Sequence, residues 1–131
     1  MTKFVISFRD GAMDFPEEEL ADVAAAASAM TREAMEAGVF VFGGGTKGGH
    51  EDAWTVSEDG VVTDGPYPES KEHLGGFIVV DVATREEALM WAGKCAAACR
   101  ATQEVRELLP EPTEDDPLPA DVVENFRATR A

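Results

Sequence analysis

The chain contains few residues of several chemically important kinds. Its 131 residues include two cysteines, two histidines and one tyrosine, and 11 basic side chains stand against 26 acidic ones. The net charge of −15 repels nucleic acid and anionic lipid, so we expect neither nucleic acid nor a membrane as a partner. Cys95 and Cys99 make no closed zinc site, because two thiols lack the third and fourth ligands. We therefore expect buried cysteines, no metal and no other cofactor.

Long apolar runs are also missing from the sequence. None approaches the roughly 18 residues that a membrane span needs. Residues 1–4 enter a strand-like alternation directly, without the basic and apolar regions of a signal peptide. These features predict a cytoplasmic protein, and the length predicts one globular domain.

Hydrophobic spacing predicts the order of the secondary-structure elements. Phe4, Ile6 and Phe8 alternate as in a strand, and apolar residues at three- and four-residue steps follow Pro16 until Gly38 ends a helix of about six turns. The further expected elements are a strand over 39–42, a hairpin over 53–63 around Glu58–Gly60, a strand over 77–82, a helix capped by Thr84 and an edge strand over 103–109. This order predicts an α+β fold, with helices on one side of an antiparallel sheet.

Two segments outside these elements need separate interpretation. The glycine-rich run 43–49 lacks the residue order of a phosphate-binding loop, and we interpret it as a flexible connection. From Pro110 the composition becomes acidic and rich in proline. We therefore divide the chain into a domain over 1–109 and a tail over 110–131, in which residues 120–130 have the spacing of a short helix.

The expected strands over 39–42 and 77–82 are apolar on both faces. Two helices cover only one face of such a sheet, and the other face would expose a larger apolar patch than monomers usually carry. The economical cover is the sheet of an identical subunit, so we predict a homodimer.

The stretch from Thr63 to Val80 contains the densest mixture of turn formers and ionisable groups. Asp64-Gly65-Pro66 has turn chemistry, and Asp64 is the best candidate for a catalytic acid or base. The alternative is that Asp64 only caps backbone N–H groups. Gly75 and Gly76 then open the next strand, and with Gly65 and Pro66 they are expected to shape the loop.

Other ionisable and aromatic residues have two interpretations each. Glu69, Lys71 and Glu72 form an ion-pair set that orders the loop, or Lys71 binds an anionic ligand. His73 either shuttles protons or is simply exposed. Arg9 and Arg106 are candidates to clamp a carboxylate on the sheet face. Trp54 and Phe77 are assigned to the core or a dimer interface rather than to substrate stacking, and His50, beside Glu51 and Asp52, is not expected to hold a metal.

Segments 62–67, 69–72 and 74–77 resemble the signature of the YCII-related family, in its DGPF subgroup. The resemblance extends more weakly over residues 3–109. It implies a ferredoxin-like fold that dimerises face to face as a dimeric α+β barrel. Tyr67 stands where the signature usually has Phe and would add a hydroxyl to a ligand site, and Ser70 stands where Thr is usual.

The resemblance does not carry a mechanism to this chain. YCII proteins outside the subgroup are associated with a histidine–aspartate pair from the first helix and its end, and here that region offers Glu36 and no histidine. One hypothesis is a small-molecule-binding dimer, with isomerase or lyase chemistry that uses Asp64 as base. The alternative is a non-catalytic accessory or regulatory protein whose acidic tail contacts a partner, since some DGPF members accompany extracytoplasmic-function sigma factors. Whether the protein is an enzyme is left open between these two.

Overall fold

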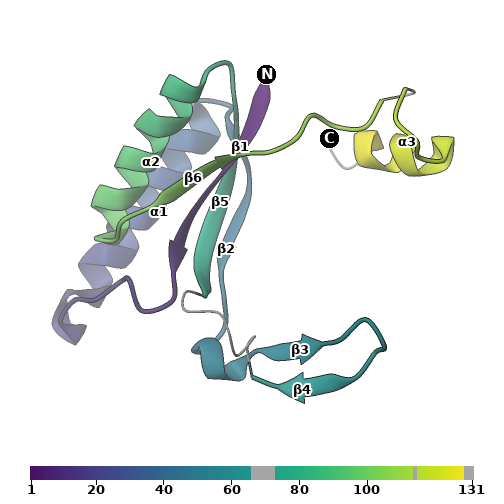
Figure 1. Cartoon of the computed structure of the whole chain (residues 1–131). Coiled ribbons are helices and arrows are strands. Elements are labelled where there is room, and N and C mark those ends of the chain that lie inside the picture. Colours follow the sequence, from purple (N-terminus) through teal and green to yellow (C-terminus); the bar gives the residue numbers. More distant parts are fainter. Residues whose placement is uncertain (66–72, 114, 129–131) are drawn as a thin grey trace.

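The computed structural model describes residues 1–65, 73–113 and 115–128 (Figure 1). Its elements are β1 (Thr2–Arg9), a 3₁₀ turn η1 (Glu17–Glu19), α1 (Leu20–Glu36), β2 (Phe40–Gly45), a 3₁₀ turn η2 (His50–Asp52), β3 (Trp54–Val56), β4 (Val62–Asp64), β5 (Leu74–Val82), α2 (Arg85–Cys99), β6 (Glu104–Glu107) and α3 (Ala120–Ala128). Every strand and helix predicted between residues 4 and 109 is present.

Four strands form one antiparallel sheet in the order β2-β5-β1-β6. The two central strands, β5 and β1, are the long ones, and β6 is a short edge strand as predicted. Helices α1 and α2 lie together on one face of this sheet (Figure 1). The architecture is the predicted ferredoxin-like α+β fold.

The hydrophobic core lies between the sheet and the two helices. Phe4, Ile6, Val80 and Val82 are at most 3% exposed and share this face of the sheet. From the helices they meet buried side chains that include Trp91. Only one face of each strand and helix meets this core. The buried residues therefore recur at every second position in the strands and at every third or fourth position in the helices.

The helix ends follow local chemistry. The Thr84 hydroxyl accepts a hydrogen bond from the Glu87 backbone N–H at 3.2 Å, which confirms the predicted cap of α2. Gly38 has φ of 75°, a conformation that suits glycine at the end of α1. The prediction of six turns was too long, because residues 17–19 form a 3₁₀ turn and α1 itself has 17 residues.

The glycine run after Phe42 was interpreted wrongly. Residues 43–45 are not a flexible connection: they belong to β2 and pair with β5. A Cβ on Gly43 would lie 2.7 Å from the Phe77 carbonyl oxygen, so only glycine allows this close approach. The connection that leaves the sheet therefore begins at Thr46.

Two segments stand away from the sheet and its helices. The β3–β4 hairpin leaves one end of the sheet, and α3 follows an extended segment from the other end (Figure 1). Both lie on the side of the sheet opposite to α1 and α2. α3 lies within the predicted tail helix over 120–130, whereas the domain boundary at residue 109 stays a prediction.

Candidate functional site

The face of the sheet that α1 and α2 leave uncovered is largely apolar. Val5 pairs with Val79, and Val79 also pairs with Phe42, so these three side chains share this face. Phe42 is 61% exposed, and its ring lies 5.8 Å from that of Phe77, tilted by 57°. We call this set of residues, together with the pocket described next, the uncovered face.

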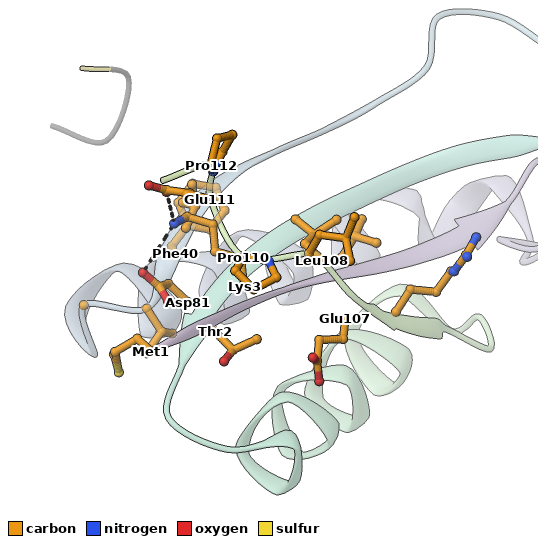
Figure 2. A pocket seen from close by; sticks show the side chains of 16 residues that line it. Met1, Thr2, Lys3, Phe40, Asp81, Glu107, Leu108, Pro110, Glu111 and Pro112 are labelled. Carbon is orange, nitrogen blue, oxygen red and sulfur yellow. Dashed lines mark hydrogen bonds and ion pairs between the residues drawn. The ribbon is translucent and has the colours of Figure 1, made fainter. Parts of the chain in front are cut away.

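A pocket of 1220 Å³ lies at one end of the uncovered face (Figure 2). Its walls come from β1, the start of β2, the end of β5, and β6 with the chain that follows it. Lys3 is its central cation: Nζ donates to Glu111 Oε1 at 2.8 Å and lies 3.8 Å from Asp81 Oδ2. These three side chains are 22–25% exposed, so the charges are partly withdrawn from water. The pocket therefore offers both signs of charge beside an apolar sheet.

Asp81 is a polar group that the sequence reasoning overlooked. Its Oδ1 is shielded from solvent and has no hydrogen-bond partner among the described residues. A buried acceptor without a donor costs about 1–3 kcal/mol, so a donor from a ligand, a water molecule or another chain would be stabilising here. The available signal was a carboxylate inside the otherwise apolar strand 77–82.

The two arginines predicted to face a ligand are placed differently. Arg106 pairs with Val5 in the sheet, lies on the uncovered face and lines the pocket. It is exposed and has no ion-pair partner within the described part of the chain. Arg9 is exposed at the end of β1, opposite Leu74, and does not line this pocket. Of the two arginines, Arg106 is thus the better-placed candidate for binding an anion in this pocket.

Asp64 lies at the end of β4 in the projecting hairpin. It is exposed, stands opposite Trp54 and lines neither this pocket nor the second one described below. Gly65 follows with φ of 99°, and its N–H donates to the Ala53 carbonyl at 2.7 Å. Trp54 is 71% exposed and therefore does not belong to the core of the subunit. Pro66, Tyr67, Glu69, Lys71 and Glu72 lie outside the described residues.

The end of the signature stretch joins three strands. The carbonyl of His73, which is half-buried, accepts from the Asp10 N–H at 2.6 Å, and the Gly75 carbonyl accepts from the Thr46 N–H at 2.9 Å. A Cβ on Gly75 would lie 2.9 Å from backbone atoms of Arg9 and Asp10. Gly75 therefore has a structural role where β1, β2 and β5 meet.

A second pocket, of 300 Å³, lies between the helices and the sheet. It is lined by both cysteines and by Met13 and Met30, and the Cys95 Sγ–H donates to Met30 Sδ at 3.6 Å. Burial, with a smaller effect from Cys99, raises the pKa of Cys95 to about 11, and burial also raises the pKa of Cys99. Both side chains are protonated at neutral pH and so are poor nucleophiles. Cys95 is buried as predicted, whereas Cys99 is half-buried.

Two further findings concern metals and membranes. In residues 1–65, 73–113 and 115–128, no three His, Cys, Asp or Glu side chains are grouped so that they could hold a metal ion. None of the helices in these ranges is both long enough and apolar enough to cross a membrane.

The family model for the YCII-related domain matches residues 2–112. The chain belongs to the YCII-related family. The match covers the whole sheet and both of its helices, and it ends three residues beyond the predicted domain boundary at residue 109. The resemblance seen in segments 62–77 is thereby confirmed.

Comparisons with individual proteins add less. A search of functionally curated proteins found no match. One solved structure that matches is 5-chloro-2-hydroxyhydroquinone dehydrochlorinase (TftG) from Burkholderia phenoliruptrix AC1100, in complex with 2,5-dihydroxybenzoquinone. It shares 18% identity over 87% of this chain and 99% of that chain, with a TM-score of 0.49. At this level of likeness we infer nothing from it about function.

Proposed function

We propose that this YCII-family protein is a homodimer that binds a small anionic metabolite between its subunits, with the pocket on the uncovered face as its site. The observation that carries the proposal is the position of Arg106, exposed and without an ion pair in the described part of its subunit, in the same pocket as Lys3 and Asp81. A guanidinium binds a carboxylate in a two-pronged geometry, and the apolar residues beside it would contact the rest of a small metabolite.

Dimerisation would turn the open pocket into an enclosed one. Phe42 and Val41 are 61% and 45% exposed on the sheet, and a second sheet would remove them from water. Exclusion of water strengthens the attraction between Arg106 and an anion, because the local dielectric constant falls. Two identical subunits also supply two copies of the site.

The reaction class we propose is proton transfer in an isomerisation or an elimination. Such chemistry needs a carboxylate base near a bound anion and a cation that stabilises the developing negative charge. Asp64 is the proposed base, and Arg106 is the proposed cation, with Lys71 and Arg9 as further candidate anion-binding groups and Tyr67 as a further candidate contact. His73 is kept as the weaker candidate for proton transfer.

The test of ligand binding is a thermal-shift screen of small mono- and dicarboxylates on the full chain. A ligand that binds the folded state raises the melting temperature. We expect Arg106→Ala to lose this rise, and Arg85→Ala to keep it, because Arg85 is exposed on α2, lines neither pocket and lies 3.8 Å from Glu86. If both variants responded like the wild type, the site would not be the Arg106 pocket. The base is tested separately: an Asp64→Asn variant that keeps full turnover of an identified substrate would remove Asp64 from the mechanism.

The test of dimerisation is light scattering at micromolar concentration. We expect a dimer for the wild type and a monomer for Phe42→Asp, because a carboxylate would be buried against an apolar sheet. Leu89→Asp is the matched control, since Leu89 is 49% exposed on α2, on the other side of the molecule. A monomeric wild type would contradict the proposal.

A second candidate function is binding of a protein partner through the tail. It is favoured by the exposure of Leu118, which is 42% exposed within the acidic tail. Leu109, directly before the tail, is 92% exposed. The test is recovery of a partner with and without residues 110–131. Unchanged recovery after truncation would exclude the tail from such binding.

A further inference from the structure

The β3–β4 hairpin, residues 54–64, is amphipathic, and no described residue of its own subunit covers its apolar face. We call it the arm. Trp54 stands opposite Asp64 and Val56 opposite Val62, so these four side chains share one face, while Thr55 and Thr63 point to the other. Trp54, Val56 and Val62 are 71%, 61% and 61% exposed. An apolar face of this kind is typical of a contact surface rather than of a solvated loop.

Among the residues that the structure describes, the contacts that hold the arm are almost all its own. The Thr55 hydroxyl donates to the Gly65 carbonyl at 2.7 Å, and the Ser57 N–H donates to the Val61 carbonyl at 2.9 Å. No helix or strand of the described chain packs extensively on β3 or β4. A two-stranded hairpin alone is only marginally stable in water. The arm therefore needs a surface outside its own subunit.

The arm extends on the same side of the sheet as the uncovered face (Figure 1). A second sheet placed on that face would come to lie beside the arm. Because a two-fold axis makes the contact reciprocal, each arm would pack on the other subunit. The two apolar surfaces would then cover each other.

Charge also favours a second copy as the occupant. The arm carries Glu58, Asp59 and Asp64 and no basic residue. Most of this acidic protein would repel it, and the pocket on the uncovered face carries charges of both signs, with Lys3 already paired to Glu111 and Asp81. Its Arg106 is exposed and has no ion-pair partner among the described residues. The arm and that face are thus complementary in polarity, and Arg106 offers a cation to a carboxylate of the arm.

We propose that the arm of one subunit packs on the uncovered face of the other, so that Trp54 and Asp64 complete the partner's pocket. This inference rests on the homodimer of the proposed function. It accounts for the position of Asp64, which lines neither pocket of its own subunit, by placing its carboxylate beside the partner's Arg106. The complete site then consists of an anion-binding cation from one subunit and a carboxylate base from the other.

Tryptophan emission tests the position of the arm in the full chain. The protein has two tryptophans, and Trp91 is 5% exposed, so the difference between the wild type and Trp54→Phe reports the surroundings of Trp54. We expect this difference spectrum to shift to shorter wavelength, and its quenching by acrylamide to weaken, over the concentration range in which light scattering shows dimers forming. A dimer in which Trp54 is quenched as strongly as in the monomer would overturn the inference and leave the proposed homodimer intact.

A pair of substitutions provides an independent measurement. Val56→Lys places a charge in the proposed contact, and Leu89→Lys places the same charge at a similarly accessible position on α2. We expect Val56→Lys to raise the dissociation constant of the dimer by about tenfold or more, and Leu89→Lys to leave it unchanged. Equal dissociation constants for Val56→Lys and the wild type would remove the arm from the interface. A wild type that stays monomeric would instead contradict the homodimer itself.

Discussion

The two faces of one sheet differ in how completely the chain covers them. Ile6 and Val80 are at most 1% exposed beneath the helices, whereas Phe42, on the opposite face, is 61% exposed. These residues come from adjacent strands, and consecutive residues of a strand point to opposite faces. The chain thus supplies a complete core on one side and an incomplete, apolar and partly charged surface on the other. The incomplete surface is where a ligand and a second subunit are expected.

Substitutions on the two faces of the sheet should show the largest difference in the free energy of unfolding. Ile6→Ala leaves a cavity under the helices, and we expect it to lower the free energy of unfolding by about 2–5 kcal/mol. Val5→Ala, one residue away on the uncovered face, should cost less than about 1 kcal/mol in the isolated subunit. Both losses are measured by urea denaturation at a protein concentration below that at which the dimer forms. Equal losses would mean that the uncovered face is already covered within one subunit.

Alanine substitutions at two glycines compare a crowded strand position with an open one. A methyl group on Gly75 would meet backbone atoms at 2.9 Å, while one on Gly44 would meet nothing within 4 Å. We expect Gly75→Ala to destabilise the protein by about 1–3 kcal/mol. Gly44→Ala should change stability by less than about 0.5 kcal/mol, as measured by the same denaturation. A neutral Gly75→Ala would argue against a structural role for this part of the signature.

The buried thiol of Cys95, on the helical side of the sheet, predicts that the stability of the protein falls at alkaline pH. Burial raises the pKa of Cys95 from 9.0 to about 11, so the folded state holds this proton more tightly than the unfolded state. The stabilisation is complete below pH 9 and is lost as the pH rises towards 11. We expect the free energy of unfolding to fall more steeply over this range in the wild type than in Cys95→Ala. Parallel pH profiles would contradict the burial of this thiol.

Loss of an ion pair should show the smallest difference in stability between the uncovered face and the helical side of the sheet. Lys3 and Lys94 each lie 2.8 Å from a glutamate, but the Lys3–Glu111 pair is 22–25% exposed and the Lys94–Glu33 pair, between the helices, is 40–53% exposed. We expect Lys3→Met and Lys94→Met each to cost less than about 1 kcal/mol, with Lys3→Met the larger. Thermal denaturation at low and high salt compares them. A larger cost for Lys94→Met than for Lys3→Met would contradict the partial burial of the charges in the pocket.

The fold was predictable because local patterns agree with the final packing. The capping box at Thr84 and the Asp59-Gly60 turn act within a few residues, so the sequence reveals them directly. The glycine run was misjudged for the opposite reason. Whether Gly43 is in a loop or a strand depends on the close approach of β5, which is distant in the sequence.

The candidate site was predictable only in part. Arg106 was expected on the sheet face, and the structure places it there, in the pocket. Asp81 was missed because its environment comes from the cross-strand pairing with Lys3 and from the return of Glu111 beside Lys3. The structure of the stretch 66–72 is not described, so the predictions for Tyr67 and Lys71 are untested.

The sequence by itself determined which residues form strands and helices, and which strand faces are apolar, because these properties follow from short-range periodicity. Only the tertiary structure decided which of the two sheet faces the helices cover, which charged side chains share a pocket, and that the β3–β4 hairpin, which carries Trp54 and Asp64, projects on the uncovered side. Those features depend on strand order and register, which join residues far apart in the chain.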